Sequence, residues 1–311
     1  MIDLFLNNPQ RSYRIDERII SKTGDDYEVL DRIGCGGNGV VYECIDRAGS
    51  VYAVKFLLSL SQKSKTRFSQ EVLLMQKANH PHLIRYIADG TVEAVENNRY
   101  KNIVEIDFVI MEKADRNLLD YMKSNEKPEY EEYAPQFRGL CEALAVLHQF
   151  AIHRDIKPEN ILIKGETWVL SDFGLCSFLS PEDHQDITKL NEKVGPMFWM
   201  SPEAIDCYYF GGKEIGKYSD VFQICLVFVF VLTHKYPGGI FSAEDIDTTP
   251  LIKELILEAI SNDYHKRPQD GLELVEKFNN ATYYQLSVDP SNHWYLIWSL
   301  FQELCCIQCL H

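Results

Sequence analysis

The sequence predicts an α+β protein of two lobes, with strands dominating the first part of the chain and helices the second. From Tyr27 to about Met111, β-branched and aromatic runs alternate with Gly, Asp and Asn turns, a pattern typical of strands. Beyond about residue 115, apolar residues recur every three or four positions, as in amphipathic helices. With 311 residues and 46% hydrophobic content, the chain can bury a substantial core. We expect a ligand cleft between the lobes.

These patterns divide the chain into three parts. Residues 1–26 form an N-terminal extension of uncertain order, and residues 27–278 form one domain. Its strand-rich lobe spans about 27–112 and its helical lobe about 115–278, with a hinge near 112–115. Residues 279–311 form an apolar, aromatic and cysteine-rich tail.

Individual elements follow from the same periodicities. Strands are expected at "VVYECI", "SVYAVKFLL" and "NIVEIDFVIM". Helices are expected over 66–79, where Phe68, Val72 and Met75 share a face, and over 131–150. The run 221–232 is apolar except for Gln223 and too short to span a bilayer, which predicts a buried core helix.

Charge and cysteine content narrow the classes of partner and location. A formal charge of −15 disfavours binding to a phosphate backbone, so we expect no nucleic-acid partner. The first residues lack a basic segment followed by an apolar run, and we therefore expect a cytoplasmic protein without a secretory signal or a membrane span. Six of the nine cysteines are scattered singly and are predicted to be reduced core thiols: Cys35, Cys44, Cys141, Cys176, Cys207 and Cys225.

A glycine-rich stretch lies between two expected strands. Gly34, Gly36 and Gly39 fit the pattern G-x-G-x-x-G, which dinucleotide-binding sites share. A dinucleotide site would be followed by a helix, but here a strand follows, which favours a hairpin that covers phosphates. Taken alone, the stretch also fits an ordinary hairpin turn.

Lys55 lies in an apolar strand, where a buried ammonium needs an anionic partner. Glu71 lies on the inward face of the helix expected over 66–79, so we expect a Lys55–Glu71 pair that leaves the ammonium near the α- and β-phosphates of a nucleotide. Each residue alone would more often be a solvated surface charge.

The stretch "HRDIKPENILI" and the following "LSDFGL" supply the remaining chemistry. Asp155 could accept the proton of a hydroxyl, and Lys157 could neutralise a transferring phosphoryl group. Asn160 and Asp172 offer oxygen ligands for Mg²⁺. His153 lacks His or Cys companions at zinc-binding spacing and is interpreted as a packed structural residue.

In this combination and order the residues resemble the signature set of eukaryotic-type (Hanks-type) serine/threonine protein kinases. The resemblance covers about 27–278, from "GCGGNG" and "AVK" through "HRDIKPEN", "DFG" and "SPE" to Asp220 in "YSDVF" and Arg267 in "HKRP". It implies the two-lobed protein-kinase fold, ATP and Mg²⁺ as cofactors, and transfer of the γ-phosphoryl group to serine or threonine of protein substrates, including this chain itself.

The resemblance also implies roles for single residues. Met111 corresponds to the gatekeeper, and Glu112 and Ala114 to the adenine-binding hinge. Glu203 and Arg267 correspond to an ion pair that anchors the activation segment. Further correspondences are the adenine sandwich of Val41, Ala53 and Leu162, the hydrophobic spine of Met75, His153 and Phe173, the brace of the catalytic loop, Asp220, and the phosphorylation candidates Ser177, Ser180 and Thr188.

The chain departs from the family pattern at a few positions. Without a gap, Pro196 replaces a threonine that would support hydroxyl substrates, and Phe222 and Gln223 replace Trp-Ser. The alternative function is a pseudokinase-type nucleotide-binding scaffold or regulatory interaction protein, but none of Lys55, Glu71 and Asp155 is lost.

The tail has an aromatic stripe at helical spacing that includes Trp294, Trp298 and Phe301. It is expected to pack on its own domain, with self-association or a partner contact as the next alternative and membrane attachment as the last.

Overall fold

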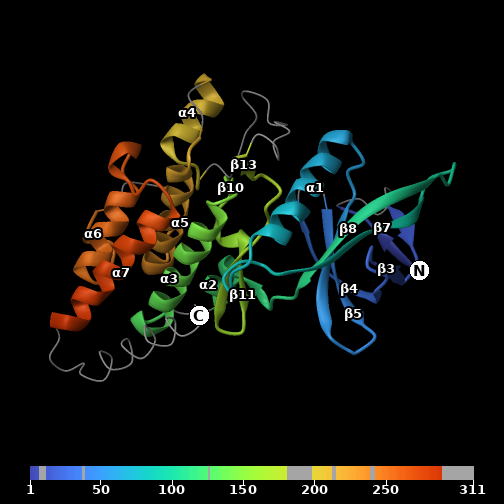
Figure 1. Ribbon diagram of the computed structural model, residues 1–311, viewed down its shortest axis with the longest axis horizontal. Coiled ribbons are helices and arrows are strands. Elements are labelled where there is room, and N and C mark those ends of the chain that lie inside the picture. Colours follow the sequence, from blue (N-terminus) through green and yellow to red (C-terminus); the bar gives the residue numbers. More distant parts are fainter. Residues whose placement is uncertain are drawn as a thin grey trace, which may run out of the picture.

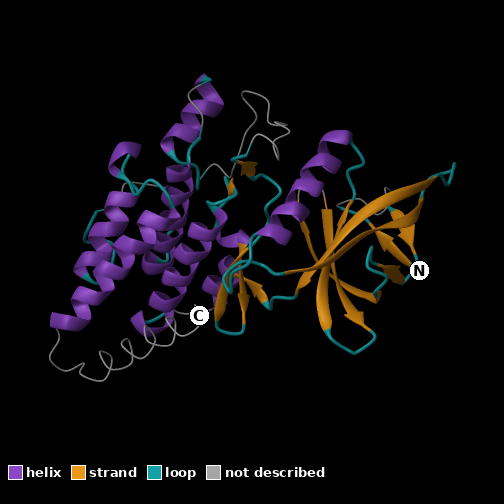
Figure 2. Ribbon diagram, in the orientation of Figure 1, coloured by secondary structure: helices purple, strands orange, loops and turns teal. Residues whose placement is uncertain are grey.

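A computed structural model describes residues 1–6, 12–36, 39–124, 127–180, 198–211, 215–238 and 242–288. Strands gather at one end of the molecule and helices at the other, as Figure 1 and Figure 2 show. The expected α+β fold of two lobes is confirmed.

The strand-rich lobe contains an eight-stranded antiparallel sheet in the order β1-β2-β7-β8-β6-β5-β4-β3. The three strands expected from the sequence are present as β5, β6 and β8. The bounds are β1 Ile2–Leu4, β2 Tyr13–Ile15, β3 Arg18–Ile20, β4 Asp26–Gly36, β5 Gly39–Asp46, β6 Val51–Leu57, β7 Tyr86–Glu96 and β8 Ile103–Glu112.

The segment before Tyr27, for which no element was predicted, supplies β1, β2 and β3. Its side chains Leu4, Ile15 and Ile19 are buried in a cluster that also contains Phe56 and Phe108 from the central strands. Because β1 and β2 extend one edge of the sheet and β3 the other, the segment is part of the lobe's core and not an appendage.

Helix α1, Gln62–Lys77, lies beside β6 and β7 (Figure 1) and starts four residues earlier than predicted. The side-chain oxygen of Ser61 caps its first turn by accepting a hydrogen bond from the Ser64 N–H. Its inward face buries Phe68, Val72 and Met75 as expected, and Glu71 is buried with them. A carboxylate is thereby held at the surface of an apolar core, next to the sheet.

The helical lobe is built around α3, Tyr130–Leu147, and α5, Lys217–Thr233. The rings of Phe137 and Phe228 stack between these helices, with their centroids 3.8 Å apart. All residues from 219 to 232 are buried, which confirms the core helix expected there. No helix within the described part of the chain is long and apolar enough to cross a membrane. The other helices are α2 Leu118–Ser124, α4 Pro202–Phe210, α6 Pro250–Ala259 and α7 Gly271–Val288, with 3₁₀ turns η1 at Pro158–Asn160 and η2 at Tyr264–Lys266.

Two small sheets lie where the lobes meet and hold the loops that carry polar residues. One sheet joins β12 (Thr167–Leu170), β11 (Ile161–Lys164) and β9 (Arg116–Asn117), and the other pairs β10 (Ala151–Ile152) with β13 (Ser177–Phe178). The loop 153–160 therefore connects β10 to β11, and the loop 171–176 connects β12 to β13. Both loops start and end in paired strands, which fixes their ends.

The cysteines only partly follow the prediction of core thiols. Cys44, Cys141 and Cys225 are buried and free, and burial raises the pKa of each thiol. Cys176 and Cys207 are partly exposed. The prediction is wrong for Cys35, which is exposed because it lies near the end of the β4–β5 hairpin, beyond the core.

Replacing Leu4 with Ala should lower the free energy of unfolding by about 2–5 kcal/mol, because the side chain is fully buried among the rings of the sheet. Chemical denaturation measures the change. Ile20→Ala, at a position in β3 that is 63% exposed, is the control and should shift the free energy by about 0.5 kcal/mol or less. Equal small effects of both changes would contradict the placement of β1 in the core.

Candidate active site

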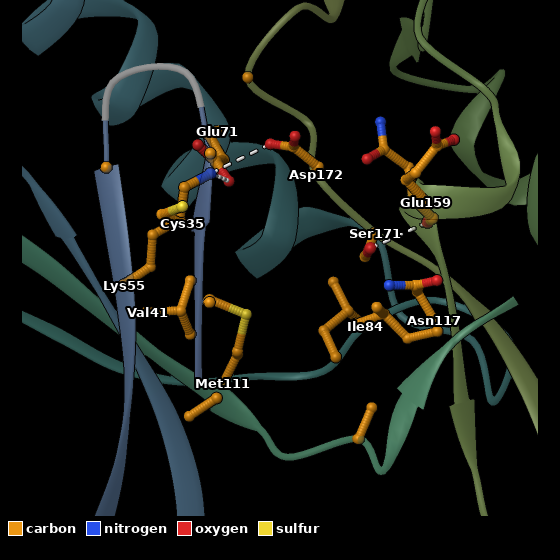
Figure 3. A pocket seen from close by; sticks show the side chains of 18 of the residues that line it. Cys35, Val41, Lys55, Glu71, Ile84, Met111, Asn117, Glu159, Ser171 and Asp172 are labelled. Carbon is orange, nitrogen blue, oxygen red and sulfur yellow. Dashed lines mark hydrogen bonds and ion pairs between the residues drawn. The ribbon is translucent and has the colours of Figure 1, made fainter. Parts of the chain in front are cut away.

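A cleft of about 1120 Å³ is lined by elements of both lobes (Figure 3). Its walls include all the catalytic, nucleotide-binding and metal-binding residues proposed from the sequence: Gly34, Gly36, Gly39, Val41, Ala53, Lys55, Glu71, Met111, Glu112, Ala114, Asp155, Lys157, Asn160, Leu162 and Asp172. Ile33 and Ile84 also line it and were not foreseen. Ile33 directly precedes the first glycine of the motif, a position that could have suggested it.

The β4–β5 hairpin forms one wall of the cleft. Gly34 pairs with Val41, and Gly36 pairs with Gly39 across the hairpin. A Cβ atom on Gly39 would lie 2.7 Å from the Phe56 carbonyl oxygen in the neighbouring strand, so a side chain cannot be accommodated there without a backbone shift. A Cβ on Gly36 would meet nothing within 4 Å. The glycines thus serve two needs, close strand packing at Gly39 and an unobstructed wall at Gly36.

Lys55 on β6 is one of the cations that line the cleft. Its Nζ lies 2.6 Å from Glu71 Oε1 and 3.1 Å from Asp172 Oδ1 (Figure 3). The predicted Lys55–Glu71 pair is therefore present. Burial alone would lower the pKa of Lys55, but the charges of Asp172 and Glu71 outweigh it and raise the pKa, so the ammonium stays protonated. Burial raises the pKa of Glu71, and the nearby ammonium opposes that rise.

Asp155 is the acid of the loop 153–160. Its Oδ2 accepts hydrogen bonds from Lys157 Nζ at 3.0 Å and from Asn160 Nδ2 at 2.8 Å. Burial raises the pKa of this carboxyl group, and the charge of Lys157 partly offsets the rise. A carboxylate with a raised pKa accepts a proton more readily, which suits a group that faces an incoming hydroxyl.

The buried carboxylate of Asp220 holds the start of this loop. Its two oxygens accept backbone hydrogen bonds from the His153 N–H at 2.6 Å and the Arg154 N–H at 2.8 Å. Arg154 has a φ of 69°, in the left-handed region that is costly for a non-glycine residue. The paired bonds to Asp220 stabilise that backbone conformation and so direct the chain toward Asp155.

His148, at the end of α3, is a supporting residue that the sequence did not reveal. Its Nδ1 accepts a hydrogen bond from the Gly271 N–H at 2.9 Å, so the ring proton lies on Nε2, which donates to Asp220 Oδ2 at 3.0 Å. Helix α3, the start of α7 and Asp220 are joined through one ring. The sequence signal that could have pointed to His148 is its place as a polar residue at the end of the apolar stripe of α3.

His153 is fully buried, as expected for a packed structural residue. Its ring lies edge-on to Phe173 with centroids 5.6 Å apart, and its Nε2 is 3.2 Å from the Ser171 carbonyl oxygen. Met75 belongs to the same core cluster as Phe173. The contacts of His153 join the loop 153–160 to the loop 171–176, next to the core cluster that Met75 of α1 shares.

The oxygen ligands proposed for Mg²⁺ come from different loops. The Asn160 side chain donates two hydrogen bonds through Nδ2, to the Asp155 carbonyl and carboxylate, so its side-chain oxygen makes neither contact. The Asp172 carboxylate meets Lys55 through Oδ1, and the charge of Lys55 lowers its pKa. Asp172 also has a left-handed backbone, with φ of 63°. A hard amide oxygen and an ionised carboxylate at the same cleft fit a magnesium ion.

The ion pair expected from the family pattern, between Glu203 and Arg267, is present in the helical lobe. Arg267, whose side chain is fully buried, donates to the two carboxylate oxygens of Glu203 at 2.8 and 2.9 Å. The Ser261 carbonyl accepts from its Nε at 2.7 Å, and the guanidinium lies 4.8 Å from the ring centre of Phe222. Phe222, which stands where the family pattern has tryptophan, therefore packs on the guanidinium.

Some residues singled out from the sequence after Asp172 are not among the described residues. Thr188 and Pro196 lie outside them, as does the aromatic tail around Trp294. Ser177 is buried in β13, where it pairs with Ile152, so this candidate could be modified only after that strand opens. Ser180 is partly exposed.

Replacing Glu203 with Gln should lower the free energy of unfolding by about 3–5 kcal/mol, because it leaves the buried Arg267 guanidinium without a counter-charge. Chemical denaturation measures this loss. Lys123→Met breaks the exposed pair with Asp120 and should change the free energy by only about 0.5 kcal/mol. A change of that small size for Glu203→Gln would show that Arg267 does not depend on the pair.

Comparison with known proteins identifies the family of the chain. The family model "Protein kinase domain" matches residues 27–283. A cysteine-rich receptor-like protein kinase 26 from Arabidopsis thaliana is 29% identical over 239 residues, which cover 75% of this chain and 34% of the relative. The phosphorylase b kinase gamma catalytic chain (liver/testis isoform) of Rattus norvegicus is 34% identical over 228 residues, 68% of this chain and 51% of the relative.

Serine/threonine-protein kinase PAK mbt of Drosophila melanogaster is 31% identical over 205 residues, covering 64% of this chain and 30% of the relative. The chain thus spans about half or less of the length of these relatives. The family model extends over most of the chain, from the β4–β5 hairpin to α7. On this match, the chain belongs to the protein kinase family.

Proposed function

We propose that the protein is an ATP- and Mg²⁺-dependent protein kinase that transfers the γ-phosphoryl group to serine or threonine hydroxyls of proteins, its own chain included. The observation that carries the proposal is the convergence of two cations, a buried base and two oxygen ligands on one cleft. Lys55, Asp155 and Asp172 come from three different elements, yet all line this cavity. Phosphoryl transfer depends mainly on such positioning and charge neutralisation.

In this mechanism the chain's own residues bind, orient and accept the proton. The glycine hairpin and the side chains of Val41, Ala53 and Leu162 surround the nucleotide, and Lys55 contacts its phosphates. Asp155 accepts the hydroxyl proton as the new bond forms, and Lys157, 3.0 Å from it, stabilises charge on the phosphoryl oxygens. Bound through Asn160 and Asp172, Mg²⁺ would neutralise phosphate charge.

Serine or threonine is the favoured acceptor on two grounds. The catalytic loop carries Lys157, as in serine/threonine kinases, whereas tyrosine kinases usually have an alanine–arginine pattern there. One relative is itself named a serine/threonine-protein kinase. A cytoplasmic setting is part of the same proposal, supported by the free thiols of the described cysteines.

Asp155→Asn should lower kcat by about 10²- to 10⁴-fold, the usual contribution of a general base, while preserving the shape of the loop. Asp172→Ala should also abolish transfer, because it removes a metal ligand and a partner of Lys55. The assay follows labelled phosphate from ATP with Mg²⁺ to the protein itself and to a basic protein, and then identifies the labelled residues. Asp247→Asn, at a side chain that is 91% exposed, is the control.

Label on serine or threonine that disappears in both active-site variants supports the proposal. Label on tyrosine would contradict the assigned specificity. Absence of transfer, with nucleotide still raising the melting temperature, would instead favour the nucleotide-binding scaffold. Turnover that is unchanged in Asp155→Asn would contradict the role of Asp155 as the base.

The acids around the cleft suggest that peptides with basic residues before the target hydroxyl are preferred. Asp115 and Asp120 line the cleft but already accept hydrogen bonds, from the Gly165 N–H and from Lys123. Glu159 also lines the cleft and is exposed. We propose that Glu159 provides most of the attraction for a basic residue.

Glu159→Gln should lower kcat/KM for an arginine-containing peptide by about fivefold, the effect of losing one exposed ion pair of about 1 kcal/mol. The value for a neutral peptide should stay the same. Glu276→Gln makes the same charge change at an exposed position of α7 and should affect neither peptide. Equal losses for both peptides, or none for the basic peptide, would rule out this recognition.

A further inference from the structure

Gln223 is a buried polar side chain in the otherwise apolar stretch 221–232 of α5. It is 2% exposed, and its neighbours Phe222 and Ile224 are buried as well. A buried amide costs free energy unless its donors and acceptor are satisfied. An apolar side chain would suit this position of α5 at least as well, so the hydrogen-bond partners of the amide are informative.

Those partners are backbone groups on either side of Asp155. The Ile156 N–H donates to Gln223 Oε1 at 3.2 Å, and Gln223 Nε2 approaches the Arg154 carbonyl oxygen at a longer 3.5 Å. One amide thus contacts the residue before the acid and the residue after it. Its orientation is fixed by these contacts, because only the oxygen can accept from the Ile156 N–H.

The three N–H groups that precede Ile156 in this loop have other acceptors. The N–H groups of His153 and Arg154 donate to Asp220, and that of Asp155 lies 3.3 Å from His153 Nδ1. Asp220 and Gln223 are three residues apart and therefore share a face of α5. The helix holds the loop from both sides of Asp155, with Asp220 on the N-terminal side and Gln223 on the C-terminal side.

We propose that Gln223 is a positioning residue that sets the orientation of Asp155 toward the substrate hydroxyl. The inference rests on the proposed kinase function and adds a residue to it. Without the amide, the Ile156 N–H loses this acceptor, and the restraint on the peptide at the C-terminal side of Asp155 is weakened. The Asp155 carboxylate then spends less time in line with the hydroxyl.

The test replaces Gln223 with Met, which has a similar length and no hydrogen-bonding amide. The expected result is a fall in kcat of about ten- to hundredfold, because a small misplacement of a catalytic group has effects of this size. The KM for ATP should stay within about twofold, since the nucleotide contacts lie on other elements. Val227→Ala, at a fully buried apolar position of the same helix, is the control: it should lower the melting temperature and leave kcat per folded molecule unchanged.

A second readout requires no turnover. Amide hydrogen exchange at Ile156 should be faster in Gln223→Met than in wild type and unchanged in Val227→Ala. If wild type transfers no phosphate, the proposed function fails, while the exchange rate still decides whether Gln223 holds the loop. If Gln223→Met does not fold, Gln223→Asn, whose amide is one methylene shorter, should show the same faster exchange and lower kcat.

Unchanged kcat in the folded Gln223 variant would overturn the proposal. So would an equal loss of kcat in Val227→Ala, which would indicate a general effect of destabilising α5. Unaltered exchange at Ile156 would show that the amide does not restrain the loop.

Discussion

The site depends first on a buried carboxylate, that of Asp220, which is held by hydrogen bonds from the His148 ring and from the backbone N–H groups of His153 and Arg154. Asp220 has no exposed surface, and burial alone would raise its pKa. Hydrogen bonds from the His148 ring and from backbone N–H groups outweigh that effect and lower the pKa below the usual 3.8. Since the folded value is the lower one, the stabilisation is complete above the unfolded pKa and is lost as the pH falls through the folded pKa. The loop of Asp155 is thus held by a group that stays ionised at neutral pH.

The second constraint is the three-residue charge cluster that joins the lobes. Lys55 belongs to β6, Glu71 to α1 and Asp172 to the loop after β12, so the ammonium touches three separate parts of the fold. Both carboxylates form an ion pair with the same nitrogen, Lys55 Nζ. If either carboxylate is removed, the other still neutralises the charge of the ammonium. The position of α1 against the sheet is consequently coupled to the conformation of the loop that offers a metal ligand. The lysine that is expected to bind phosphates thus makes both of its ion pairs only when α1 and the loop after β12 are in place.

Much of this site could be predicted because its signals are local. Lys55 stands out as a cation in an apolar strand, and the inward face of α1 pointed to Glu71 as its partner. The roles of His148 and Gln223 could not be predicted, because their contacts bring together residues more than 60 positions apart. Strands of three residues, such as β2, are too short to show alternation, and β2 is stabilised by pairing with the distant strand β7. The prediction that Cys35 is buried was wrong, because the residue type alone does not indicate that the end of the β4–β5 hairpin extends beyond the core.

The N-terminal strand also bears on the nucleotide wall of the cleft. Arg32 and Tyr42 face each other across the β4–β5 hairpin, just before the glycines. Arg32 donates to the Leu6 carbonyl at 2.8 Å and lies over the Phe5 ring, and the Tyr42 hydroxyl donates to the Asp3 carbonyl at 3.1 Å. Both strands of the hairpin are therefore tied at one level to the backbone of residues 3–6. A bend of the glycine-rich end toward a nucleotide would leave these contacts in place only if it occurred beyond Arg32 and Tyr42. A segment that precedes the family match thereby supports the hairpin that lines the cleft.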